Sequence, residues 1–175
     1  MNRYPSPHLS TPARVLGSAQ LAWAWLIKGL IWLQSPALLA ARIYVGYAFW
    51  LSGLTKVRDW ETTLALFENE YSVPLLSPTL AAYLGTAGEI VLPILLVLGL
   101  GGRFAALGLT VLNAVAVASL MELAPVAAQQ HLFWGALLGT VALFGPGAWA
   151  LERWLGPRLG ALCHQLASRS GVAPI

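Results

Sequence analysis

Three polar side chains that could take part in chemistry lie inside long apolar runs of the sequence. Arg42 lies in "ARIYVGYAFWLSGLTKVRDW", Glu89 lies in "LGTAGEIVLPILLVLGLG", and Asn113 lies in a third apolar run. Ionisable residues inside a membrane span are costly, so they face the protein interior or a cavity and are candidate functional residues. At 1.5 Å per residue, Glu89 and Asn113 each lie about 15 Å from the turn that joins their two runs.

We therefore predict one buried polar cluster of Arg42, Glu89 and Asn113. A carboxylate held beside a cation inside a bilayer is suited to bind a proton or a quinone head group. Two alternatives without chemistry stay open. In the first, the cluster is an internal structural ion pair. In the second, the long Arg42 side chain extends to the membrane surface.

A second polar cluster is predicted where the spans reach the opposite membrane surface, and it consists of Lys56, Glu122 and His131. A histidine beside a carboxylate would titrate near neutral pH. One histidine and one carboxylate are too few ligands for a metal, so no metal site is predicted. For Lys56 the simpler alternative is again extension to the surface.

A regular row of residues marks one face of the run that holds Arg42. Arg42, Gly46, Phe49, Gly53 and Lys56 follow one another at spacings of four, three, four and three, which places them on one side of a helix. Small residues on such a face let a neighbouring helix approach closely inside lipid. We predict that Gly46, Phe49 and Gly53 form a packing face.

A proline in the run that holds Glu89 contributes to the same packing. Pro93 lies one turn beyond Glu89, and a proline inside a helix removes a backbone donor and kinks the helix. The carbonyls that it frees must find other partners inside the membrane. We therefore include Pro93 among the predicted helix-packing residues.

The elements that position these residues follow from the composition. The chain has 175 residues, of which 58% are hydrophobic and 10% are charged, against about 25% charged in soluble domains. Runs of about 20 apolar residues are long enough to cross a bilayer. We predict an all-α membrane protein whose domain at 36–150 is an antiparallel bundle of four transmembrane helices, with spans at about 36–57, 77–100, 103–123 and 126–144.

The segment before the first span is predicted to lie on the membrane rather than across it. Its apolar stretch "LAWAWLIKGLIWL", residues 21–33, is short and contains Lys28 and three tryptophans. These features favour an amphipathic helix in the interface within the N-terminal segment 1–35. A signal peptide is the alternative, although a lysine inside its apolar core argues against it.

The distribution of charge predicts the orientation of the spans. Basic residues gather on one side of a four-span arrangement, and cytoplasmic loops are the ones enriched in Lys and Arg. This side includes the N-terminal segment 1–35 and the C-terminal tail 151–175, so both are predicted to be cytoplasmic. The segment 58–77 is then an external, acidic and partly helical loop. The basic residues on the cytoplasmic side are Arg3, Arg14, Lys28, Arg103, Arg153, Arg158 and Arg169.

Several function classes lack their sequence signals. The sequence contains no phosphate-binding glycine loop followed by lysine, no HExxH and no nucleophile elbow. No basic stripe with interleaved aromatic residues indicates a nucleic-acid partner. The single cysteine, Cys163, excludes a disulfide within the chain. We therefore do not expect the chain to be an enzyme by itself.

The helix-face row resembles the first-helix pattern of the DoxX family. Further features agree in order: Glu89 with Pro93, then "LGLGGRFAALGL" at 98–109, His131 three residues before Trp134, and "GPGAWALERWL" at 145–155. The resemblance covers about residues 37–155, and Glu152 stands where family members often have aspartate. It implies a small four-helix, multi-pass protein of the bacterial cytoplasmic (inner) membrane. Some relatives are linked to a thiosulfate:quinone oxidoreductase or to stress-response and thiol-homeostasis complexes.

The expected function combines this resemblance with the polar residues. We expect an accessory subunit of a membrane redox or stress-response complex that contacts quinone, has a protein partner and holds no tightly bound cofactor. One alternative is a scaffold that anchors a soluble partner through the loop 58–77 or the basic tail. The other is a small transporter or channel whose path connects the two predicted polar clusters.

Overall fold

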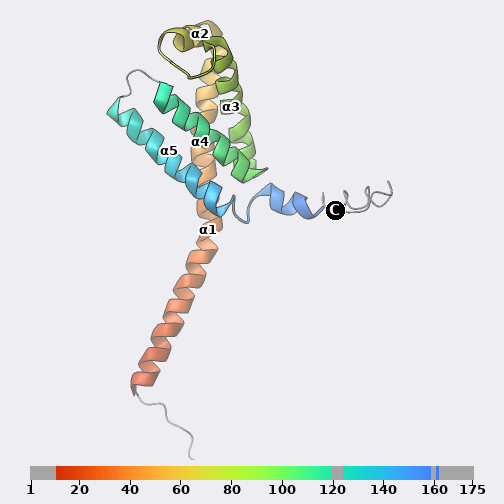
Figure 1. Cartoon of the computed structure of the whole chain (residues 1–175). Helices are drawn as coiled ribbons and strands as arrows, with labels where there is room; N and C mark the ends of the chain where they lie inside the picture. Colours follow the sequence, from red (N-terminus) through yellow and green to blue (C-terminus); the bar gives the residue numbers. More distant parts are fainter. Residues whose placement is uncertain (1–10, 120–123, 159–160, 162–175) are drawn as a thin grey trace, which may run out of the picture. The chain divides into compact units, whose positions relative to one another are not determined.

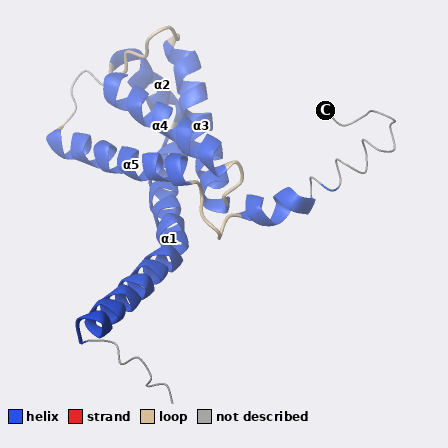
Figure 2. Ribbon diagram, turned by 60° about the horizontal axis from the view of Figure 1, so that its bottom comes forward, coloured by secondary structure: helices blue, strands red, loops and turns tan. Residues whose placement is uncertain are grey.

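The computed structural model describes residues 11–119, 124–158 and 161, with side chains from residue 19 onward. Five helices follow one another along the chain (Figure 1), and a short helical segment covers 151–158. The described residues form no β-strand (Figure 2), in agreement with the predicted all-α class. The five helices are α1 (Thr11–Arg58), α2 (Trp60–Asn69), α3 (Pro78–Leu98), α4 (Gly102–Ser119) and α5 (Pro125–Phe144).

Three segments of these helices are long and apolar enough to cross a membrane. They are Ala19–Arg58, Pro78–Leu98 and Gly102–Ser119. The fourth predicted span, 126–144, is also helical as α5, but it does not belong to this set. The mean hydropathy of α5 is lowered by three polar residues in its first two turns, Gln129, Gln130 and His131.

The segment before the first predicted span is helical but lacks the polar face of the predicted amphipathic helix. The described residues divide into two units between Gln34 and Ser35, and α1 is helical over Thr11–Arg58 although it contains Pro36. Apolar side chains between Leu21 and Leu33 are exposed on every side of the helix, so no polar face lies opposite an apolar one. Within this segment the Lys28 ammonium lies 5.3 Å from the centroid of the Trp25 ring, at the distance of a cation–π interaction.

The unit at 35–175 is a helical bundle with one main apolar core. α4 lies between α3 and α5 (Figure 1), and its small residues Ala105 and Ala106 are completely buried. Phe49 of α1 is buried in the same core, with its ring centroid 5.6 Å from that of Trp134 on α5. The core is formed by Leu38, Val45, Phe49, Leu96, Ala105, Ala106, Leu109, Leu138 and Val141.

α1 and α3 approach each other closely at the two glycines of the predicted packing face. A Cβ atom on Gly46 would lie 2.7 Å from Val97 Cγ2, and one on Gly53 would lie 2.8 Å from Ile90 Cγ1. Both distances are shorter than side chains tolerate, so a larger residue would force the helices apart. Pro93 is buried inside α3, which continues past it as a helix.

α2 packs across the first turns of α3 and forms a smaller core. Phe67 of α2 is buried against Ala81 and Ala82 of α3. Asp59 caps the start of α2, because its carboxylate accepts hydrogen bonds from the Thr62 backbone N–H at 3.0 Å and from the Thr62 hydroxyl at 2.7 Å. Such a cap satisfies donors that the first turn of a helix otherwise leaves unpaired.

The Asp59 cap predicts a pH-dependent contribution to stability. The bonds from the Thr62 hydroxyl and N–H hold the pKa of Asp59 below its ordinary value. A carboxylate whose pKa is lower in the folded state stabilises the fold above its unfolded pKa of about 4, and this contribution is lost as the pH falls through the folded pKa. We expect Asp59→Ala to lower the thermal unfolding midpoint at about pH 7, and the difference from the wild type to shrink as the pH falls from the unfolded pKa through the lower folded pKa of Asp59.

The measurement is a series of thermal midpoints in detergent for both proteins across this pH range. Glu61→Ala is the matched control, because Glu61 is exposed in the same first turn but is not the capping residue. A pH-independent difference between Asp59→Ala and the wild type would show that the cap is not the source of the effect.

Candidate functional site

The central polar contact of the bundle is an ion pair between Lys56 in the last turn of α1 and Glu89 in the middle of α3. The Lys56 ammonium donates to Glu89 Oε1 at 2.9 Å, to Glu89 Oε2 at 2.7 Å and to Ser52 Oγ at 2.9 Å. The side chains are 20% and 15% exposed. An ammonium has three donors, so Lys56 is fully engaged, whereas the Glu89 carboxylate keeps lone pairs for another donor.

A cavity of about 360 Å³ lies beside this ion pair and reaches from α1 and α3 to α4 and the segment after α2. Most of its wall is apolar, and the polar groups are few. This combination is typical of small-molecule sites, where a few polar groups orient a mainly apolar ligand. The lining residues are Lys56, Phe67, Tyr71, Val73, Pro74, Leu76, Ala81, Leu84, Gly85, Glu89, Val111, Leu112, Val115 and Ser119.

Ser119 provides a free hydroxyl in the cavity wall. Its side chain is 2% exposed, and its Oγ has no hydrogen-bond partner among the described residues. Its backbone carbonyl accepts a bond of 2.9 Å from the Ser72 N–H, which ties the segment after α2 to the end of α4. A buried hydroxyl without a partner is costly, so a ligand that reached this atom would gain a hydrogen bond.

Tyr71 provides a second hydroxyl in the same wall. Its ring stacks on Phe67 with the centroids 4.9 Å apart. Burial, together with the negative charges of Glu89 and Glu70, raises the pKa of Tyr71 above its ordinary value. The phenol is therefore protonated at neutral pH and can donate a hydrogen bond. The sequence carried no signal for Tyr71 or Ser119, because an isolated tyrosine or serine near a helix end is common.

Arg42 does not pair with Glu89 as predicted, nor does it extend to the surface. Its side chain is 0% exposed. It donates from Nη1 to the Leu96 carbonyl at 3.3 Å and the Val97 carbonyl at 3.2 Å, and from Nη2 to the Trp149 carbonyl at 3.1 Å. The last carbonyls of a helix lack partners within it and carry partial negative charge, and Arg42 satisfies both needs at the end of α3.

The segment after α5 completes this arrangement around Arg42. Glu152 Oε2 accepts a hydrogen bond of 3.0 Å from the Gly102 N–H at the start of α4, and the Glu152 N–H donates to the Gly99 carbonyl at 3.1 Å. Gly99 has φ +67°, and a Cβ atom there would lie 2.5 Å from Arg42 Nη1. We call Arg42, Gly99, Trp149 and Glu152 the Arg42 clasp, because they join α1, the α3–α4 turn and the segment after α5.

Asn113 pairs with His131 and with neither Arg42 nor Glu89. Its Nδ2 donates to the His131 backbone carbonyl at 2.9 Å, and its Oδ1 lies 2.7 Å from His131 Nδ1. The amide oxygen can only accept, so this geometry assigns the imidazole proton to Nδ1. The pair joins α4 to α5 and is a polar contact of the bundle interior.

The two predicted clusters are therefore regrouped in the structure. Lys56, predicted for the outer cluster, pairs with Glu89 of the buried cluster, while His131 and Asn113 form a separate pair. Glu122 lies outside the described residues. Within residues 11–119, 124–158 and 161, no group of three His, Cys, Asp or Glu side chains is placed to hold a metal ion.

Comparison with known proteins identifies one family. Residues 37–122 match the family model described as DoxX, and this region contains Lys56, Glu89, Tyr71 and Ser119. No curated protein and no solved structure matches the chain.

Proposed function

Because this chain belongs to the DoxX family through its domain at 37–122, we propose that it is an accessory subunit of a membrane redox complex and holds a quinone-type head group beside Lys56 and Glu89. The family domain and the three apolar helices identify it as an integral membrane protein. The observation that carries the proposal is the cavity of about 360 Å³ with this ion pair in its wall.

The hydrogen-bonding groups of the cavity suit a neutral ligand that is both acceptor and donor. The Ser119 and Tyr71 hydroxyls can donate to a quinone carbonyl, and the free lone pairs of Glu89 can accept from a quinol hydroxyl. An anionic head group is disfavoured because Lys56 already gives all of its donors to Glu89 and Ser52. The apolar walls cover the ring of the ligand.

In this proposal the electrons are transferred by a partner subunit. The described residues of this chain bind and orient the head group. Glu89 accepts a hydrogen bond from the quinol hydroxyl. This division of roles agrees with a family domain that is small and with polar groups that serve binding rather than covalent chemistry. The accessory role and the quinone site are thus one proposal with two separately measurable parts.

The membrane arrangement proposed with this role has four spans. α5 serves as the fourth, because it packs along α4 and shares the apolar core through Leu138 and Val141. The excess of basic residues on one side supports cytoplasmic termini in a bacterial inner membrane. The exposed acidic residues of α2, Glu61 and Glu68, then face the outside.

The test is to purify the full chain from native membranes and to quantify bound quinone and co-purifying subunits. We expect quinone and a protein partner with the wild type, and about fivefold less quinone with Ser119→Ala or Tyr71→Phe, the loss of one neutral hydrogen bond. Ser119→Ala removes a hydroxyl that has no hydrogen-bond partner among the described residues, so the fold should be unaffected. Thr110→Val is the matched control, because the Thr110 hydroxyl bonds to the Ala106 carbonyl of its own helix at 2.8 Å.

The two parts of the proposal can fail separately. A stable wild-type protein that carries no quinone would refute the head-group site. Purification without any partner subunit would refute the accessory role. Equal quinone content in Ser119→Ala, Tyr71→Phe and Thr110→Val would place the quinone elsewhere on the protein.

A scaffold is the second candidate function, and the exposed carboxylates of α2 favour it. Glu61 and Glu68 are exposed on α2, and Glu70 is exposed at its C-cap. These carboxylates would suit a basic partner surface. Crosslinking from α2 positions in native membranes tests this candidate. Capture of one defined basic protein would support it, and the absence of any specific product would count against it.

A further inference from the structure

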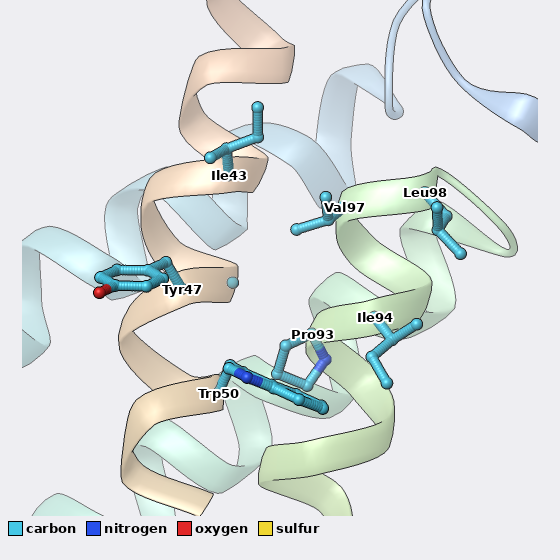
Figure 3. A pocket seen from close by; sticks show the side chains of 8 residues that line it. Ile43, Tyr47, Trp50, Pro93, Ile94, Val97 and Leu98 are labelled. Atoms are coloured by element: carbon cyan, nitrogen blue, oxygen red, sulfur yellow. The ribbon is translucent and has the colours of Figure 1, made fainter. Parts of the chain in front are cut away.

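Two further hollows lie where α1 packs against α3, in addition to the cavity beside Lys56 and Glu89. The first, the Pro93 hollow, has a volume of about 320 Å³ and is lined by entirely apolar surface from residues that include Gly46, Trp50, Pro93 and Val97. Figure 3 shows Trp50 and Tyr47 of α1 on one side of it and Ile94 and Leu98 of α3 on the other. The second, the Thr86 hollow, has a volume of about 480 Å³ and is lined by Val57, Trp60, Tyr83, Thr86, Ala87 and Ile90.

The two hollows lie on one continuous strip of the α1–α3 surface. On α3 the lining residues recur at spacings of three and four from Tyr83 to Leu98, which is one helix face about 22 Å long. On α1 the lining residues of the Pro93 hollow recur in the same way from Ile43 to Trp50, and Val57 of the Thr86 hollow follows seven residues later on the same face. Neither hollow shares a lining residue with the cavity beside Lys56 and Glu89. We call this strip the α1–α3 groove.

Among the described residues that line this groove, only Thr86 has a deeply buried hydroxyl. Its side chain is 5% exposed, and its Oγ1 has no partner among the described residues. The hydroxyls of Thr55, Thr110 and Thr140, by contrast, each bond to the carbonyl four residues earlier in their helix. An unpaired buried hydroxyl costs free energy that an acceptor on a ligand would recover.

The chemistry of the groove defines its occupant. The lining of both hollows contains no charged residue, so a charged group is not held there. At the Thr86 end the rings of Trp60 and Tyr83 contact each other, with their centroids 4.6 Å apart, and the Pro93 end is wholly apolar. A partner helix could supply an acceptor only from a polar side chain, because its backbone carbonyls are bonded within the helix, whereas the carbonyl of an ester is free.

We propose that the α1–α3 groove binds one acyl chain of a membrane glycerolipid. The ester carbonyl accepts a hydrogen bond from Thr86 Oγ1 beside the Trp60–Tyr83 ring pair, and the chain follows the groove into the Pro93 hollow toward Leu98. This site is separate from the proposed quinone site and does not depend on it.

Photocrosslinking in nanodiscs tests the proposal with the full chain. The probe is phosphatidylethanolamine with a diazirine on one acyl chain, and the labelled residues are mapped by mass spectrometry. We expect labels to concentrate within 43–57 and 83–98, and labelling there to fall about fivefold in Thr86→Val. Thr110→Val should label like the wild type.

A second variant fills the groove instead of removing its donor. Ile94 is partly exposed in the wall of the Pro93 hollow, so Ile94→Trp should occupy the path of the chain and reduce labelling. Leu107→Trp makes the same kind of change on the exposed face of α4 and should have no effect. Thermal midpoints of all variants establish that each is folded.

Two results would overturn the proposal. Labels spread evenly over the exposed faces of α1, α4 and α5, and unchanged by Thr86→Val and Ile94→Trp, would show only lipid that surrounds the protein. Displacement of the probe by a short-chain quinone, but not by excess unlabelled phosphatidylethanolamine, would assign the groove to a different ligand. Ser119→Ala should leave the labelling unchanged, so failure of this site and failure of the quinone site are distinguishable.

Discussion

Replacement of Arg42 by methionine is expected to lower the free energy of unfolding by about 3 kcal/mol or more. Methionine keeps much of the apolar stem but removes all three hydrogen bonds of the guanidinium. The Val97 and Trp149 carbonyls would then lie in the bundle without this donor, and a buried carbonyl without a partner costs about 1–3 kcal/mol. The measurement is equilibrium unfolding of the purified protein in mixed micelles.

Two further variants separate the geometry of the Arg42 clasp from its charge. Arg42→Lys keeps the positive charge at the end of α3 but offers a single nitrogen, which cannot span the distance from α3 to Trp149 as the planar fork does. We expect an intermediate loss of stability. Arg58→Met is the control on the same helix, because Arg58 is exposed, and it should change stability by less than about 0.5 kcal/mol. Equal stability of Arg42→Met and Arg58→Met would show that the clasp does not stabilise the bundle.

Separate replacement of Lys56 or Glu89 by glutamine is expected to destabilise the protein by about 2–4 kcal/mol. Each single change leaves one charge that is mostly enclosed and has lost its partner, and such a charge is costly. The double variant Lys56→Gln with Glu89→Gln removes both charges together. It should therefore lose less stability than the sum of the two single variants, with a coupling energy of about 1–3 kcal/mol.

Unfolding free energies of the wild type, both single variants and the double variant give this coupling energy directly. Glu61→Gln serves as the control for loss of an exposed carboxylate and should change stability by less than about 0.5 kcal/mol. Additive single-variant effects would contradict the ion pair as a stabilising contact. Quinone binding is then measured in the double variant only if it is folded, because a binding loss in an unstable protein carries no information about the cavity.

The broad class of this protein was predictable because composition and hydrophobic run length act without tertiary contacts. The bilayer demands about 20 apolar residues per span, and the runs that hold Gly46, Glu89 and Asn113 meet this demand in α1, α3 and α4. The spacing of Gly46 and Gly53 also identified the side of α1 that approaches α3, since helical periodicity alone sets which residues share a face. The DoxX resemblance rested on this same row and is shown by the match over 37–122.

The structure of the N-terminal segment was less predictable. The sequence predicted an interfacial helix within 1–35 and a separate span from about residue 36, but α1 is one helix from Thr11 to Arg58 that contains Pro36. A proline costs a helix one hydrogen bond and a steric contact, and this local penalty does not by itself decide whether the remaining bonds keep the helix intact. Tertiary structure was also needed to show that Tyr71 and Ser119, from two distant segments, share a cavity wall.

What the sequence by itself determined is how far each polar residue lies along its own helix and which face it occupies. The tertiary structure alone decided the pairing, because the axial offset between neighbouring helices is absent from any single run of residues. Arg42 comes level with the last turn of α3 and bonds to the Leu96 and Val97 carbonyls. Leu96 lies seven residues beyond Glu89, which is about 10 Å along the helix. The same axial offset between α1 and α3 brings Lys56 level with Glu89. The two side chains form an ion pair in the wall of the cavity.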